Sequence, residues 1–113
     1  MKYVIFTLAM LVIFSCKKNS ESSLPGCIDK YVSQALSKPK GTMAISIDAY
    51  TYQNKTVYLY ISGCCDQYDL LYDEHCTPLF APSGGITGRG DGTHPDFFTD
   101  AVFIKSIWKD PRP

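Results

Sequence analysis

The sequence predicts an α+β domain in which one N-terminal helix packs on a small antiparallel sheet. Three features predict it: a helical apolar stripe after Pro25, a two-residue alternation over residues 43–62, and a β-branched, aromatic segment at Ala101–Trp108. The composition agrees, because 45% hydrophobic and 13% aromatic residues are typical of a folded globular protein. A chain of 113 residues has room for one domain.

The predicted helix begins at Pro25, whose missing N–H would have no partner in a first turn anyway. Pro39 and Gly41 end it. Apolar residues recur at helical spacing and form one face, while polar residues take the opposite side. The apolar face consists of Ile28, Tyr31, Val32, Ala35 and Leu36. We expect this face to cover the sheet.

Residues 43–62 predict an antiparallel hairpin with a three-residue connection, Gln53-Asn54-Lys55. Aliphatic residues alternate with polar and tyrosine residues on both strands. The aliphatic set is Ile45, Ile47, Ala49, Val57, Leu59 and Ile61, and the tyrosines are Tyr50, Tyr52, Tyr58 and Tyr60. We expect the aliphatic set to seat the helix and the tyrosines to share the other face, where cross-strand aromatic pairs stabilise a sheet.

Ala101–Trp108 predicts a third strand, which Pro111 and Pro113 terminate because prolines cannot continue a ladder. About 35 residues of turn-like sequence separate this strand from the hairpin, more than a compact domain usually leaves irregular. We therefore expect a long loop that is stapled by disulfides or carries the function.

The N-terminus predicts export. Val4–Phe14 is an apolar run shorter than the roughly 20 residues of a membrane-spanning helix, and its length fits a signal peptide. Ile13-Phe14-Ser15-Cys16 resembles the lipobox of bacterial lipoproteins, although Phe14 is bulkier than usual. The resemblance implies a signal peptide over residues 1–15, an acylated Cys16, a polar tether over 16–24 and a domain over 25–113. The alternative is an ordinary signal peptide with Cys16 beside the cleavage site.

An exported chain meets an oxidising compartment, and four cysteines follow Cys16: Cys27, Cys64, Cys65 and Cys76. The adjacent doublet has the wrong spacing for a zinc site, and an even count leaves no thiol for a nucleophile. We predict two structural disulfides. Because a Cys64–Cys65 bridge would close a strained ring, each member of the doublet is expected to pair elsewhere. Two pairings then remain, in which Cys27 bonds one member of the doublet and Cys76 bonds the other, and strand parity favours Cys27–Cys65 with Cys64–Cys76.

The sequence from Cys64 onward carries a distinctive pattern: Cys64-Cys65-Asp66-Gln67, Leu71-Tyr72-Asp73, Gly84-Gly85-Ile86-Thr87-Gly88-Arg89-Gly90-Asp91-Gly92, Pro95-Asp96-Phe97 and Ile107-Trp108. It resembles a family of small bacterial lipoproteins that carry a single domain of unknown function. The resemblance covers nearly all of the mature chain from Cys27 onward. It implies a location in the cell envelope and a fold class, and no activity. It also implies that many members carry two more cysteines near Phe80 and His94.

The glycine-rich segment Gly84–Asp96, called the glycine loop below, is the candidate binding loop. Its candidate residues are Gly85, Thr87, Gly88, Arg89, Gly90, Asp91 and Asp96. A phosphate cradle would need Lys and Ser/Thr opening a helix, and these are missing. The tripeptide Arg89-Gly90-Asp91 is short enough to arise by chance.

Two further expectations concern this loop. Asp91, Asp96 and Asp100 could together offer oxygen ligands to Ca²⁺, but their spacing matches no calcium loop, so we expect them to accept loop hydrogen bonds and expect no metal or cofactor. We also expect the loop to be ordered, with Ile86 and Phe97 supplying apolar groups to bury and prolines limiting its entropy.

Eleven basic and eleven acidic residues leave no electrostatic footprint for nucleic acid. We interpret Asp66, Asp69, Asp73 and Glu74 as a solvated face, and His75 and His94 lack a free cysteine for a Cys/His hydrolase.

The sequence thus predicts a lipid-anchored, extracytoplasmic protein that is not an enzyme and has a structural or binding role, with the membrane and an envelope protein as its partners. The alternatives are a small inhibitor or protein-binding module presenting the glycine loop, and a metal-assisted hydrolase using loop aspartates. The oligomeric state stays open.

Overall fold

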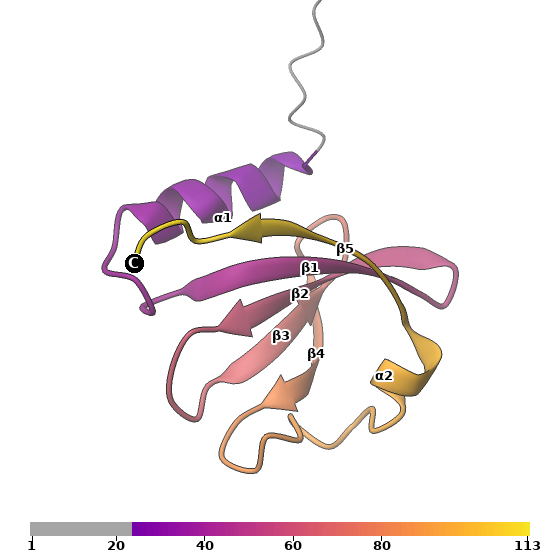
Figure 1. Cartoon of the computed structure of the whole chain (residues 1–113). Coiled ribbons are helices and arrows are strands. Elements are labelled where there is room, and N and C mark those ends of the chain that lie inside the picture. The colour runs from indigo at the N-terminus through magenta and orange to yellow at the C-terminus, as the bar shows by residue number, and fades with distance from the viewer. Residues whose placement is uncertain (1–23) are drawn as a thin grey trace, which may run out of the picture.

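The computed structural model describes residues 24–113, so the predicted signal peptide, Cys16 and nearly all of the tether lie outside the described residues. The described chain is an α+β domain, as predicted. Helix α1 (Gly26–Leu36) packs on a five-stranded antiparallel sheet of order β4-β3-β2-β1-β5 (Figure 1). Within these residues neither α1 nor the short α2 (Phe97–Asp100) is long and apolar enough to cross a membrane.

The first four strands form a meander, and the last strand returns to pair with the first. Their bounds are β1 (Ala44–Tyr52), β2 (Lys55–Ser62), β3 (Tyr68–Tyr72), β4 (Pro78–Gly84) and β5 (Val102–Lys109). The hairpin and the C-terminal strand are therefore confirmed. Strands β3 and β4 lie where a long irregular loop was expected. They are short, and β4 carries Pro78 and Pro82, which an edge strand tolerates because one side of it has no neighbour to bond.

The β1–β2 turn has two residues, not the predicted three. Gln53 and Asn54 both adopt positive φ (50° and 62°) between the paired Tyr52 and Lys55, the twist that two-residue hairpins favour. One residue fewer in the turn shifts the cross-strand partner of every β2 position by one, which reverses the face it shares. Ile47 of β1 therefore lies opposite Tyr60 instead of Ile61.

The expectation that the aliphatic residues of β2 meet the helix is wrong for this reason. The core under α1 contains Ile28, Ala44, Ile47 and Tyr60, all buried. The ring of Tyr60 lies 4.6 Å from that of Tyr31 on the helix and 4.4 Å from that of Tyr72 on β3 (ring centroids). Burial among these rings raises the pKa of Tyr60 well above its ordinary value. Tyrosines thus form part of the core here.

The opposite face of the sheet carries a second core. Val57, Leu59 and Leu71 pack there against Phe97, which is the first residue of α2 and is 1% exposed. Figure 1 shows α1 and α2 on opposite sides of the sheet. The second cover is thus a loop with one buried aromatic side chain.

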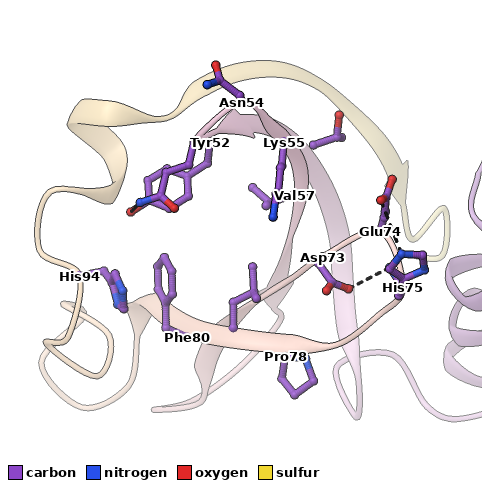
Figure 2. A pocket seen from close by; sticks show the side chains of 13 residues that line it. Tyr52, Asn54, Lys55, Val57, Asp73, Glu74, His75, Pro78, Phe80 and His94 are labelled. Atoms are coloured by element: carbon purple, nitrogen blue, oxygen red, sulfur yellow. Dashed lines mark hydrogen bonds and ion pairs between the residues drawn. The ribbon is translucent and has the colours of Figure 1, made fainter.

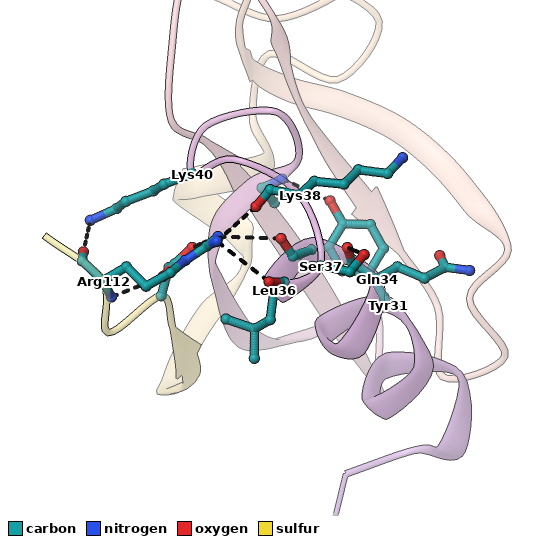
Figure 3. A network of polar contacts seen from close by, with 10 residues as sticks. Tyr31, Gln34, Leu36, Ser37, Lys38, Lys40 and Arg112 are labelled. Atoms are coloured by element: carbon teal, nitrogen blue, oxygen red, sulfur yellow. Dashed lines mark hydrogen bonds and ion pairs between the residues drawn. The ribbon is translucent and has the colours of Figure 1, made fainter.

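The C-terminus completes the first face. The Arg112 guanidinium donates hydrogen bonds to the carbonyl oxygens of Lys38 (2.7 Å) and Ala35 (3.2 Å), at and just beyond the C-terminal end of α1 (Figure 3). The same guanidinium pairs with the buried Asp110 carboxylate at 2.7 Å. The Asp110 backbone N–H donates to Ile45 O at 2.7 Å. These bonds fix the helix end to the sheet.

Two disulfides are present, but their predicted pairing is wrong. The structure joins Cys27 to Cys76 and Cys64 to Cys65, with Cα–Cα distances of 6.2 and 3.7 Å. Cys64 precedes β3 and Cys76 follows it, so the two lie at opposite ends of a five-residue strand, about 15 Å or more apart. That separation exceeds the roughly 7 Å that a disulfide can span between Cα atoms. The prediction failed because it had no β3.

Candidate binding hollow

A hollow of about 790 Å³ lies at one end of the sheet, between the β1–β2 turn and the β3–β4 turn (Figure 2). Both turns lie at this end because the strands of the meander alternate in direction. The lining residues of the first turn and its strands are Tyr52, Gln53, Asn54, Lys55, Thr56 and Val57; those of the second are Asp73, Glu74, His75, Pro78, Leu79 and Phe80; His94 comes from the glycine loop. The term hollow refers to this set below.

Aromatic rings form one wall of the hollow. The ring of Tyr52 lies 6.0 Å from that of Phe80 and 5.1 Å from that of the buried Phe97. The imidazole of His94 stacks on Phe80, with 3.6 Å between centroids and 11° between planes. Stacked and edge-on rings hold one another in place, so this wall is preformed.

A chain of hydrogen bonds orients His94. Thr93 Oγ1 lies 2.7 Å from both Asp91 Oδ1 and His94 Nδ1. A carboxylate only accepts, so the Thr93 hydroxyl donates to Asp91 and its oxygen accepts from Nδ1–H of His94. This assignment leaves Nε2 of a neutral imidazole as a hydrogen-bond acceptor. The hollow thus contains one imidazole held in a defined tautomer.

Ionisable side chains line another part of the hollow. The Asp73 carboxylate accepts from the backbone N–H groups of His75 (2.8 Å) and Thr77 (2.9 Å), and these bonds lower its pKa. Asp73 therefore closes its own turn. Glu74 pairs with His75 at 3.6 Å, with both side chains largely exposed. Across the hollow, Lys55 supplies a cation (Figure 2).

The glycine loop is ordered by backbone bonds, as predicted. Asp91 N–H donates to Ala81 O and its carboxylate accepts from Ala81 N–H, both at 2.9 Å, so Asp91 is held against strand β4. Gly85 N–H donates to Gln67 O (2.8 Å) and Gly90 N–H to Gly84 O (3.0 Å). The expectation that Ile86 is buried is wrong, because 88% of it is exposed.

The structure divides the predicted loop residues. Thr87, Gly88 and Arg89 form an exposed tip, with Gly85 at its base. Asp91 is committed to Ala81 and Thr93, and these bonds lower the pKa of its carboxyl. Neither Asp91 nor Asp96 lines the hollow, although Thr93 links the Asp91 carboxylate to the His94 imidazole. Among residues 24–113 no three His, Cys, Asp or Glu side chains are grouped to hold a metal.

Sequence reasoning missed the wall of the hollow. The sequence analysis assigns Tyr52 to a sheet face, treats Phe80 only as a position near which related chains carry cysteines, and treats His94 as another such position and as a histidine without a free cysteine partner. Two cysteines that form a disulfide must lie close together, so cysteines at these positions in related chains would indicate that Phe80 and His94 are neighbours. The structure stacks the rings at these two positions.

Comparison with known families identifies the domain. A family model described as Domain of unknown function (DUF6970) matches residues 33–110. The chain belongs to the DUF6970 family. The match runs from the middle of α1 to Asp110, so the DUF6970 domain includes every strand, the glycine loop and the hollow. No curated protein and no solved structure matches the chain.

Proposed function

We propose that this DUF6970 protein is a lipid-anchored protein of the bacterial cell envelope whose domain binds a ligand and catalyses no reaction. The hollow is the proposed binding site. The observation that carries the proposal is the preformed aromatic wall of Tyr52 and Phe80 with the oriented imidazole of His94.

The chemistry of the hollow defines the ligand class. Its volume of about 790 Å³ falls within the range of small-molecule sites, roughly 300–1,000 Å³. Tyr52 and Phe80 offer apolar surface, while Gln53, Asn54 and His94 offer donors and acceptors. This combination suits a small organic ligand with one flat apolar side and a hydrogen-bonding edge. Because the rings are already positioned, little ordering entropy opposes binding.

The lipobox at Ile13-Phe14-Ser15-Cys16 supports the anchor. Helix α1 begins beside Cys27, whose sulfur lies 3.8 Å from the backbone oxygen of Glu74, a residue of the hollow. The first turn of α1 and the hollow thus lie at the same end of the domain. Nine tether residues reach at most about 30 Å, so an anchored domain would hold the hollow near the bilayer.

Two experiments test this proposal. Fatty-acid labelling of the full chain should modify the wild type and leave Cys16→Ala unlabelled; label retained by Cys16→Ala would refute the anchor. For binding, the melting temperature is measured against panels of saccharides, amino acids, short peptides and nucleosides. A ligand of the hollow should raise the melting temperature of the wild type and of Ile86→Ala, but not that of His94→Ala or Tyr52→Ala. Equal shifts in all four proteins would place binding elsewhere, and no shift with any panel would refute the proposed ligand class.

A second candidate function rests on the loop tip. Ile86 is 88% exposed next to Thr87 and Arg89 on a loop that hydrogen bonds hold rigid, a surface that suits a protein partner. Ile86→Ala and Arg89→Ala should then weaken capture of one envelope protein by the full chain, while His94→Ala leaves capture unchanged.

A further inference from the structure

The two disulfides of the domain have different surroundings. Cys27 and Cys76 are partly buried, join α1 to the β3–β4 turn, and lie 49 residues apart in sequence. Cys64 and Cys65 are adjacent and exposed, in the turn between β2 and β3. A thiol in solution can therefore reach the second bridge more readily than the first.

Stability does not account for the Cys64–Cys65 bridge. A disulfide stabilises a fold chiefly by closing a loop in the unfolded chain, and the effect grows with loop length. Adjacent residues close no such loop. The bridge also joins no two elements, because both cysteines belong to the same turn. A role in chemistry explains it better than a role in folding.

The turn keeps its frame without help from the sulfurs. Ser62 N–H donates to Asp69 Oδ1 at 2.8 Å, and Ser62 Oγ lies 2.9 Å from Gln67 Oε1 and 3.0 Å from Cys64 O. Asp69 Oδ2 accepts from Ser83 Oγ on β4 at 2.8 Å. These bonds tie the turn to the sheet. Opening the bridge would therefore leave β2, β3 and β4 paired.

Two residues of this turn have an uncommon backbone conformation. Cys65 and Asp66 have φ of 56° and 47°, in the left-handed region that non-glycine residues seldom occupy. A shallow depression of about 270 Å³ borders the cysteines, between Gln67 and Gly84–Gly85. It gives an attacking group room to approach the sulfurs. An attack on the bridge therefore needs no movement of the core.

We propose that Cys64–Cys65 is a thiol–disulfide exchange site that an extracytoplasmic dithiol reduces. One thiolate of the reductant attacks one of the two sulfurs, the S–S bond breaks, and the other cysteine leaves as a thiolate. The second thiolate of the reductant then attacks the reductant's own sulfur in the mixed disulfide, the bond between reductant and domain breaks, and the second domain cysteine leaves as a thiolate. Two electrons pass to the domain, which gains two protons and ends with two thiols, and the reductant ends as a disulfide.

Charge selects among reductants. Asp66 is exposed beside the bridge, and Asp69 lies at its base. These carboxylates repel an anionic thiol such as glutathione more than an uncharged dithiol. The exchange rate should therefore be higher with an uncharged dithiol than with glutathione. A higher salt concentration should reduce the difference between the two rates.

The test uses the oxidised full chain. It is titrated with an uncharged dithiol, with glutathione and with a thioredoxin-type protein, quenched in acid, alkylated and mapped by mass spectrometry. Cys64 and Cys65 should become alkylated at about tenfold lower dithiol than Cys27 and Cys76, because exposed bridges are the labile ones. Hydrogen exchange of the sheet should not change at that point. Faster reduction by the thioredoxin-type protein than by the small dithiol would identify a protein reductant, and the reverse a small one.

Matched double variants complete the design. Cys64→Ser/Cys65→Ser should have the melting temperature of the wild type and should show no reduction at the lower dithiol concentration. Cys27→Ser/Cys76→Ser should have a lower melting temperature than the wild type. Simultaneous opening of both bridges, loss of sheet protection when Cys64–Cys65 opens, or a map that shows no bond between these two cysteines would each overturn the proposal. The wild-type titration decides the matter even if a variant fails to fold.

Discussion

The two faces of the sheet are covered in different ways. On one face, α1 packs with an amphipathic stripe, is joined to the β3–β4 turn by Cys27–Cys76, and is fixed at its end by Arg112. On the other face the cover is mostly irregular chain, held by one buried ring, Phe97, and by the backbone bonds of Asp91 to Ala81. The first cover depends on contacts between distant parts of the chain. The second cover depends on the contacts of a few residues, chiefly Phe97 and Asp91.

This difference has a functional meaning. The stapled helix lies away from the hollow, except where Cys27 meets Glu74. The loop cover supplies His94 directly to the hollow, through the Asp91–Thr93–His94 chain of bonds. The face that irregular chain covers thus holds the residue most suited to recognise a ligand.

The largest effect should come from the loop face. Phe97→Ala removes a ring that is 1% exposed from the core with Leu59 and Leu71, and we expect a loss of about 3–5 kcal/mol in the free energy of unfolding. Urea denaturation measures it. Phe98→Ala, at a neighbouring residue that is 50% exposed, is the control and should cost less than about 1 kcal/mol. Equal losses would mean that Phe97 is no anchor.

The helix face should respond next. Cys27→Ser/Cys76→Ser opens a 49-residue loop, and we expect about 2–4 kcal/mol of destabilisation. Thermal and urea unfolding of the oxidised proteins measure it. If the loss falls below about 1 kcal/mol, α1 is held by packing and Arg112 alone, and the contrast between the two covers disappears.

Substitutions at two loop glycines distinguish the cost of a positive φ from the cost of a steric overlap with strand β4. A Cβ on Gly90 (φ +69°) would overlap Ala81 O and come within 2.7 Å of Pro82 C and Ser83 N, whereas one on Gly88 (φ +75°) would meet nothing within 4 Å. Gly90→Val should cost more than about 2 kcal/mol, and Gly88→Val only about 1 kcal/mol for the left-handed backbone. Calorimetry compares them. Equal costs would show that the loop does not press on β4.

The smallest expected effect is a pH dependence on the helix face. Hydrogen bonds from Arg112 lower the pKa of Asp110 from its ordinary 3.8 to about 2. The folded state therefore favours the carboxylate, so this stabilisation is complete above about pH 4 and is lost as the pH falls through about 2. In Asp110→Asn the free energy of unfolding should fall less steeply as the pH is lowered, which urea unfolding from pH 5 to 2 measures. A wild-type slope in Asp110→Asn would refute the assignment.

Predictability also differed between the faces. The periodicity of Ile28, Tyr31, Val32 and Ala35 predicted α1, and alternation predicted β1, β2 and β5, because each signal is local in sequence. The face assignment failed on one residue, Lys55, which belongs to strand β2 and not to the turn. Strand β4 was missed because its prolines are tolerated only at an edge, and edge position follows from the assembled sheet.

The candidate site was harder to predict than the fold. Tyr52, Phe80 and His94 come from three separate segments, and no spacing in the sequence relates them. The loop glycines were recognised as demanding positions, but which of them approaches the neighbouring strand depends on packing. Asp91 was expected to bond loop N–H groups and instead also bonds strand β4.

The strand order has a consequence for the way the chain folds. Strands β1 to β4 pair with their neighbours in sequence through short turns, whereas β5 pairs Val102 with Thr51 across some 50 residues. Closing a long loop costs more chain entropy than closing a short one, so local pairings precede distant ones. We expect the β1–β4 meander to form first and β5 to pair last. Phe97 and His94 lie between β4 and β5 in the sequence, so they would reach their final positions together with β5. The binding surface would then be completed only in the final step of folding, and pulse-labelled hydrogen exchange should show β5 amides protected after those of β2.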